Sequence, residues 1–230
     1  MAIAHPFKPS SLNIPHYKPN TLTQLEILVG FFVCVFVILV GTVFLSRRFA
    51  KRRLSTGQLL TVCWFTVCGF IHIILEGYFG LFNKTLAGSQ CTLAQIWKEY
   101  AISDSRYVIS DGMVVSIESF TAFVEGPFCF VTAVMYIRNN PWRYSVQLAV
   151  SLGQLYGTIL YFVVEYLDGF QHGILWHPVY FWFYFVFMNI WWFIVPLILS
   201  VQSMRQLSSA QKLYDNKQIK PVALKNKKKK

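Results

Sequence analysis

Five stretches of this chain are apolar over more residues than a helix or strand of a soluble protein needs. They occupy residues 25–46, 59–82, 112–137, 145–166 and 178–201. An α-helix needs about 20 apolar residues to cross the roughly 30 Å of hydrocarbon in a bilayer. Only 13% of the residues are charged, whereas an average soluble domain has about 25%. We therefore predict an all-α polytopic membrane protein with five transmembrane helices.

The basic residues are unevenly distributed between the segments that connect these stretches. The chain has a net charge of +11. Of its 21 Lys and Arg residues, all lie after the first, third or fifth stretch except Lys8, Lys18, Lys84, Lys98 and Arg106. Cytosolic segments carry the excess of Lys and Arg in membrane proteins. The positive charge therefore indicates topology rather than nucleic-acid binding, with a lumenal or external N-terminus and a cytosolic C-terminus.

This topology divides the chain into a lumenal N-terminal arm at 1–24, a five-span membrane domain at 25–201 and a basic cytosolic tail at 202–230. The arm contains no apolar segment typical of a signal peptide. Four prolines predict that it is extended and lies on the membrane surface, namely Pro6, Pro9, Pro15 and Pro19.

The tail ends in four lysines, Lys227–Lys230. This ending resembles the dilysine retrieval signal of endoplasmic reticulum membrane proteins. A polybasic segment that contacts anionic lipid is an equally supported interpretation. We expect a multi-pass protein of the endoplasmic reticulum membrane.

The sequence contains none of the motifs that bind a nucleotide, metal or haem. There is no phosphate-binding glycine loop, HExxH or CxxC pattern. Four of the five cysteines lie within apolar stretches, so a disulfide framework is not indicated. His172 and His177 lack carboxylate or thiol neighbours in the sequence and make a weak metal site. We expect no cofactor and no metal.

Ionisable residues interrupt two of the apolar stretches: His72 and Glu76 in the second, and Glu118 and Glu125 in the third. Each such residue costs about 2.5–3.5 kcal/mol at the centre of a membrane helix. A single one can be a protonated packing residue, but the set of His72, Glu76 and Glu118 favours a functional site. Glu125 precedes Gly126-Pro127, where backbone groups need partners, and structural support and function are equally supported for it.

Helical spacing places these residues on common faces. His72 and Glu76 are separated by four positions, and Glu118, Thr121 and Glu125 follow a similar spacing. In the last stretch Asn189 and Trp192 are three positions apart. The fourth stretch has a polar face composed of Gln147, Ser151, Gln154, Thr158 and Glu165.

These faces predict a polar pocket inside the membrane. Counting about 1.5 Å per residue from the lumenal ends places Glu76 and Glu118 at similar depths in the lumenal half. The cytosolic halves of the second and third stretches carry no charge, whereas a conduit needs polar lining along its whole length. A closed pocket fits this pattern better than a channel.

Carboxyl and imidazole groups in such a pocket are suited to proton transfer. Desolvation shifts the titration of both kinds of group toward neutral pH, so that one can donate a proton and another remove one. Carboxylates and the face of a Trp ring can stabilise a transient cation. The composition therefore indicates cofactor-free proton transfer on a lipid-soluble substrate.

Five segments of the chain are distinctive together: CGFIHIILEGYF (68–79), WKEYAISDSRY (97–107), SIESFTAFVEGP (116–127), QLYGTILYF (154–162) and HPVYFWFYFVFMNIWW (177–192). They resemble the emopamil-binding protein family, the 3-beta-hydroxysteroid delta-8, delta-7 isomerases of sterol biosynthesis. The resemblance covers most of residues 25–200, with the same motif order. It is closer to the isomerases than to their sigma-2 receptor-like relatives.

The resemblance implies a shift of the sterol B-ring double bond. Carbon 9 is protonated, a cation forms at carbon 8, and a proton leaves carbon 7. His72 and Glu76 would donate the first proton, while Glu118 would take the other or stabilise the cation. Which carboxylate is the acid and which the base stays open, because coupled groups share protons.

The same resemblance assigns roles to residues around these three. Thr121 would support Glu118, and Asn189 and Trp192 would orient and cover the cationic centre. The motif residues Asp104, Arg106 and Tyr107 are expected to hold a lumenal lid rather than take part in chemistry. In the family Glu125 is often replaced by an apolar residue, and no catalytic role is assigned to it.

The expected partners are a sterol substrate, cationic amphiphiles that mimic the sterol cation, and the lipid bilayer. Nucleic acid is not expected, and a homodimer is left open. Two alternatives remain. One is a non-catalytic membrane protein that binds sterols or cationic amphiphiles, which the complete residue set argues against. The other is a proton-coupled transporter, which the absence of an internal repeat argues against.

Overall fold

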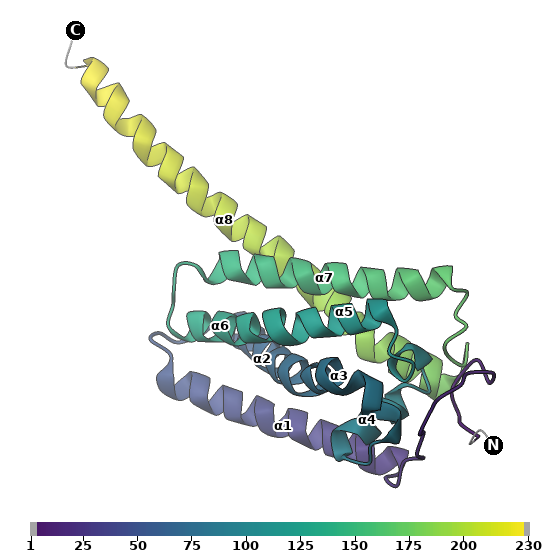
Figure 1. Ribbon diagram of the computed structural model, residues 1–230. Coiled ribbons are helices and arrows are strands. Elements are labelled where there is room, and N and C mark those ends of the chain that lie inside the picture. The colour runs from purple at the N-terminus through teal and green to yellow at the C-terminus, as the bar shows by residue number, and fades with distance from the viewer. Residues whose placement is uncertain (1–3, 228–230) are drawn as a thin grey trace.

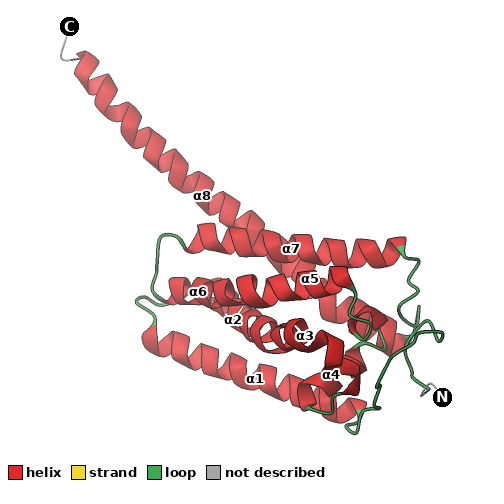
Figure 2. Cartoon of the chain, viewed as in Figure 1, coloured by secondary structure: helices red, strands yellow, loops and turns green. Residues whose placement is uncertain are grey.

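A computed structural model describes residues 4–227, and every regular element among them is helical (Figures 1 and 2). In chain order the elements are α1 (Gln24–Phe49), α2 (Thr56–Phe70), η1 (Ile71–Glu76), α3 (Gly77–Phe82), η2 (Asn83–Gly88), α4 (Thr92–Tyr100), η3 (Ser105–Tyr107), α5 (Gly112–Phe120), η4 (Thr121–Glu125), α6 (Gly126–Ile137), α7 (Arg143–Leu167), η5 (Pro178–Phe187) and α8 (Met188–Lys227). Several are continuous, and they form 5 helices long and apolar enough to cross a membrane. The prediction of an all-α protein with five such helices is confirmed.

The connecting segments gather at the two ends of the helical bundle (Figure 1). The N-terminal arm, α4 and the loop after α7 lie at one end, which we call the arm end. The loops after α1 and α6 lie at the other, the tail end, from which α8 projects. The arm end contains each of the five basic residues that the sequence analysis assigned to the lumenal side.

The helices begin where local capping satisfies their first N–H groups. Thr23 and Glu26 form a reciprocal capping box at the start of α1, and Ser55 and Gln58 form one at the start of α2. Every span except the third is longer than its predicted apolar stretch. In particular, α8 continues far beyond residue 201, because the polar residues that follow are good helix formers.

The N-terminal arm packs against protein, a contact that the sequence analysis did not predict. Phe7 is only 1% exposed. The backbone N–H of Lys18 donates to the Ala87 carbonyl over 2.9 Å, and the Gln95 side chain accepts from the N–H of Leu22. The arm therefore covers the arm end of the bundle. Lys228–Lys230, which include most of the predicted retrieval signal, lie outside the described residues.

Three of the five spans contain a π-helical segment: η1, η4 and η5. Hydrogen bonds in a π-helix join residues five apart instead of four, which shifts the side chains that follow around the helix. Side chains bind carbonyl groups in these regions. Trp97 Nε1 donates to the Leu75 carbonyl over 2.8 Å, and Asn189 Nδ2 donates to the Phe185 carbonyl over 2.8 Å. Each π segment lies next to a residue that the sequence analysis placed in the site.

Candidate functional site

A cavity of about 170 Å³ lies among the helices, toward the arm end. Residues from all five spans border it, together with residues of α4 and η3. Its lining is mostly apolar and aromatic, with few polar side chains. All six residues that the sequence analysis placed in the site border it: His72, Glu76, Glu118, Thr121, Asn189 and Trp192.

His72 and Glu76 form a buried pair at the cavity wall. Nδ1 of His72 lies 2.6 Å from Oε2 of Glu76, and the two residues are 1% and 9% exposed. The Thr121 hydroxyl donates a hydrogen bond to the same Oε2. One oxygen of Glu76 thus contacts both the His72 ring and the Thr121 hydroxyl, and no hydrogen bond among the described residues engages the other, Oε1.

Glu118 is bound by a residue from outside the membrane spans. The Tyr107 hydroxyl donates to Oε1 of Glu118 over 2.5 Å. Tyr107 is buried, and burial raises the pKa of its phenol, which keeps the phenol protonated as a donor. Tyr107 stacks on Trp97 with ring centroids 4.7 Å apart. The expected role of Tyr107 in a lid is therefore incomplete, because its hydroxyl holds a site carboxyl.

Gln154 binds the far side of the His72 ring. Its Nε2 lies 3.1 Å from Nε2 of His72 and 3.7 Å from Sγ of Cys129. Gln154 is 2% exposed and also borders the cavity. The polar face of the fourth stretch included Gln154, but nothing in the sequence paired it with His72.

Asn189 and Trp192 of the fifth span also border the cavity. Asn189 Nδ2 donates to the Tyr100 hydroxyl over 2.6 Å as well as to the Phe185 carbonyl. The Tyr100 hydroxyl is also 3.2 Å from that of Tyr161. The Trp192 ring lies edge-on to His72, with centroids 6.3 Å apart. Both N–H groups of the Asn189 amide are therefore used by these acceptors. The amide oxygen is left to bind a ligand.

Glu125 does not border this cavity, although its spacing predicted a common face with Glu118 and Thr121. The predicted face assumed α-helical geometry, whereas Thr121–Glu125 is π-helical. The wider turn moves Glu125 to the interface with α7, where it is 4% exposed and faces Gly153. The predicted common face is wrong at this residue.

The predicted polar face of the fourth stretch is also divided between separate environments. Gln147 lies away from the cavity and donates to the Leu199 carbonyl and to Ser203. It also accepts from the Tyr136 hydroxyl over 2.5 Å. Thr158 and Gln154 border the cavity. A single helix face thus serves both helix packing and the cavity.

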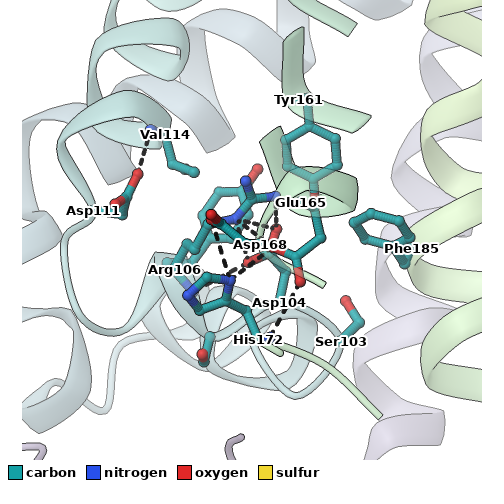
Figure 3. A network of polar contacts seen from close by, with 12 residues as sticks. Ser103, Asp104, Arg106, Asp111, Val114, Tyr161, Glu165, Asp168, His172 and Phe185 are labelled. Carbon is teal, nitrogen blue, oxygen red and sulfur yellow. Dashed lines mark hydrogen bonds and ion pairs between the residues drawn. The ribbon is translucent and has the colours of Figure 1, made fainter. Parts of the chain in front are cut away.

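A buried network of charged groups lies at the arm end of the bundle (Figure 3). Arg106 donates to both oxygens of Asp104, with the shortest contact at 2.6 Å. Its Nε lies 3.4 Å from Oε2 of Glu165, and the guanidinium carbon is 4.8 Å from the centre of the Tyr161 ring. Burial opposes the charge of Arg106, but the contacts with Asp104 raise its pKa overall. This network anchors the loop that carries Tyr107.

The prediction that His172 lacks carboxylate neighbours is wrong. Glu165, Asp168 and His172 in this network could offer ligand atoms to a metal, since these atoms lie within 4.8 Å of one another. However, Nδ1 of His172 already lies 2.7 Å from Oε2 of Glu165, and the same oxygen faces Arg106. A fixed guanidinium beside a ligand oxygen repels a metal cation. The donor set is explained by its ion pairs and fits a metal poorly.

The cavity combines two carboxyl groups, an imidazole and an amide oxygen within an aromatic wall. Each carboxyl group has one oxygen held by donors. Such an arrangement can transfer a proton to a ligand and remove another from it. It can also stabilise positive charge that develops between these steps.

Comparison with known proteins places this geometry in context. Residues 92–203 match the family model described as EXPERA (EXPanded EBP superfamily). This range includes Tyr107, Glu118, Thr121, Asn189 and Trp192. His72 and Glu76 lie outside it.

Curated relatives extend the similarity over almost the whole chain. The chain is 46% identical over 216 residues to the 3-beta-hydroxysteroid-Delta(8),Delta(7)-isomerase of Rattus norvegicus, covering 94% of both chains. It is 43% identical to the protein of the same name from Cavia porcellus and 44% identical to that from Mus musculus, with 94% coverage of both chains in each case.

Proposed function

The chain belongs to the EXPERA (EXPanded EBP superfamily) family, and we propose that it is a sterol isomerase that moves a double bond from the delta-8 to the delta-7 position. The proposal rests on the names of its relatives and on one observation. The six residues expected from the sequence, which come from three separate spans, border a single cavity. A cavity among apolar helices suits a substrate that is dissolved in the bilayer.

In this reaction Glu76 is the proton donor to carbon 9. His72 Nδ1–H and the Thr121 hydroxyl both donate to Oε2, so the transferable proton resides on Oε1. After transfer, the same two donors stabilise the carboxylate that remains. The pair therefore favours the state in which the proton has reached the substrate.

Glu118 receives the proton from carbon 7. Tyr107 holds Oε1 of Glu118, which leaves Oε2 for the substrate. Between the two steps the cation at carbon 8 faces the oxygen of the Asn189 amide and the ring of Trp192. One proton enters and one leaves, so the reaction needs no cofactor. Glu118 and Glu76 must exchange their protons with the surroundings before the next turnover.

The same site accounts for binding of cationic amphiphiles, because an ammonium group imitates the charge of the intermediate. We place the cavity in the lumenal half of the endoplasmic reticulum membrane, with the N-terminus in the lumen and the C-terminus in the cytosol. The distribution of basic residues between the arm end and the tail end supports this orientation.

Sterol analysis in cells that lack their own delta-8, delta-7 isomerase tests the function. The native chain is expected to restore delta-7 sterols. Glu118→Gln is expected to lose at least 100-fold in activity at equal expression, because an amide cannot accept the proton. Ser116→Ala, at an exposed position on the same helix, is the matched control. Continued accumulation of delta-8 sterols with the well-expressed native chain would favour a non-catalytic binding protein.

A further inference from the structure

Two buried polar atoms near His72 have no hydrogen-bond partner within residues 4–227, which the structure describes: Oε2 of Glu125 and Oε1 of Gln154. Glu125 is 4% exposed and Gln154 is 2% exposed. An unsatisfied buried polar atom costs about 1–3 kcal/mol. Neither residue was needed for the reaction as described above. Their location beside the proton donor suggests a shared role.

The Glu125 side chain lies at the interface between η4 and α7, and Gln154 lies on α7. The Glu125 carboxyl lies against Gly153, the residue that precedes Gln154, so closely that any Cβ at position 153 would meet its Oε1. Glycine at this position provides the space that the carboxyl occupies. On the next residue, the Gln154 amide directs its Nε2 at His72 and Cys129. Both donor hydrogens of the amide are therefore engaged, and its oxygen is left.

Among the described residues, the Glu125 carboxyl has no ion-pair partner and its Oε2 has no hydrogen-bond donor. The titratable groups that face it are His72, Glu76, Cys68 and Cys129, and His72 is already paired with Glu76. No Lys or Arg contacts it among the described residues. A carboxylate buried without a cation or a donor is far less stable than the neutral acid, and the neutral acid has one O–H to donate.

We propose that protonated Glu125 donates a hydrogen bond to Oε1 of Gln154 and thereby positions the amide that sets the tautomer of His72. A single bond would satisfy both of the unpartnered atoms. It would also prevent the amide from turning over, so that Nε2–H of Gln154 always meets the His72 ring. Glu125 is on this basis a positioning residue that acts through Gln154.

The orientation of the Gln154 amide determines which nitrogen of the His72 ring carries the hydrogen. When Gln154 donates to Nε2 of His72, that nitrogen must accept, and the ring hydrogen is on Nδ1. Nδ1–H then donates to Oε2 of Glu76, and the acidic proton of Glu76 resides on Oε1 at the cavity. If the amide turned over, its oxygen would draw the hydrogen to Nε2. Glu76 would then donate from Oε2 to Nδ1 and could not protonate a substrate.

The expected effect on kcat rests on the proposed isomerase function. The expected tautomer of His72 does not depend on that function. Glu125→Leu removes the donor and places an apolar residue in an apolar setting. Glu125→Gln keeps a donor, because its amide N–H can replace the acid O–H. The matched control is Ser151→Ala, which removes a buried hydroxyl of α7 that also has no partner among the described residues. All three are compared in the full-length chain with the native protein.

Nitrogen NMR of labelled histidine reads the tautomer directly, with the His72 signals assigned by their loss in His72→Asn. We expect Nε2 of His72 to lack a hydrogen in the native chain, in Glu125→Gln and in Ser151→Ala, and to carry one in Glu125→Leu. The kcat of Glu125→Leu is expected to fall about tenfold with little change in KM, since Glu125 does not border the cavity. Its pH–rate profile should shift, and Glu125→Gln should restore both properties.

A native His72 with its hydrogen on Nε2 would overturn the inference, as would an unchanged tautomer in Glu125→Leu. If Glu125→Gln were as impaired as Glu125→Leu, the acidic proton itself would be required, which contradicts a positioning role. The expected tautomers in a chain without any isomerase activity would refute the proposed function and leave the positioning role standing.

Discussion

Glu76 and Glu118 differ in the donors that hold them. The partners of Glu76 come from the membrane spans, namely His72 and Thr121. Glu118 depends on Tyr107 in a connecting segment. The difference gives the two carboxyls distinct environments at the same cavity. A pair of carboxyls in different environments can divide the roles of acid and base.

The hydrogen bond from Tyr107 to Glu118 yields the first prediction. Tyr107→Phe removes this donor and little of the stacked ring area. A hydrogen bond to a charged group contributes about 1.5–3 kcal/mol, so we expect kcat to fall about 10- to 100-fold. The kcat of Tyr107→Phe is measured from sterol turnover in purified microsomes. Tyr156→Phe, at a position 65% exposed, should behave as native, and an equal effect of both changes would show that the bond is irrelevant.

Glu99 yields a prediction about pH. It is 7% exposed and lies on α4, outside the spans. Burial raises the pKa of Glu99, although hydrogen bonds from Gln24 and Tyr180 oppose the shift. The folded state therefore binds its proton more tightly than the unfolded state does. This stabilisation is full below the ordinary pKa of 4.5 and is lost as the pH rises through the raised value.

Glu99→Gln keeps an oxygen for the Gln24 amide but has no charge to bury. We expect its Tm in detergent to exceed that of the native chain at pH 8 by about 2 °C or more, with the difference vanishing near pH 4. Thermal unfolding, followed by tryptophan fluorescence, measures the Tm of both chains at the two pH values. A difference that is the same at the two pH values would exclude titration of Glu99 as its cause.

Among the elements, the π segments decide which polar residues meet at the cavity. An α-helix through 118–125 would keep Glu118 and Glu125 on one face. The π-helical turn at η4 separates them. Hydrophobic periodicity cannot reveal such a turn, because it depends on which carbonyl groups find partners in other helices. The sequence analysis therefore placed Glu125 on the wrong helix face.

The N-terminal arm owes its position to α4. Nζ of Lys98 is buried and donates to the Lys18 carbonyl, the Ser89 carbonyl and Oε1 of Gln90, at 2.8, 2.8 and 3.1 Å. The arm also buries Phe7 and Tyr17 against the helical core. The arm is thus an integral part of the fold.

Lys98→Met should release the arm, because it leaves these three acceptors without a donor, and each costs about 1–3 kcal/mol. We expect protease cleavage between residues 8 and 20 to accelerate at least tenfold relative to the native chain. Lys84→Met, at an exposed position on the same end, is the control. Equal resistance of Lys98→Met and the native chain would show that Lys98 does not hold the arm.

At the scale of the whole molecule, the two ends differ in charge and in structure. The arm end is closed by the arm, α4 and the loop after α7, whereas the tail end has the basic residues of the loops and of α8 (Figure 1). This asymmetry supports the proposed lumenal position of the arm end.

Glycosylation mapping tests that orientation. An Asn-X-Ser acceptor introduced at the exposed Gln90, near Gly88, should be glycosylated in microsomes. An acceptor at Ser55, which lies at the tail end, should not be. Removal of the glycan by a glycosidase verifies the gel shift. Modification at Ser55 alone would invert the proposed topology.

The number of spans could be predicted from the chain because it follows from local physics, and the same physics pointed to His72, Glu76 and Glu118, which border one cavity. A run of apolar residues long enough for the bilayer must be helical. An ionisable residue within it is costly and is therefore retained mainly where it has a function.

The contacts of these residues depend on neighbours that are distant in the chain. Tyr107 reaches Glu118 because the Asp104–Arg106–Glu165 network anchors its loop. Gln154 reaches His72 because α7 packs against the third span, and Glu125 leaves the cavity because the backbone turns more widely at η4. Each of these outcomes depends on packing between helices, which no local pattern encodes.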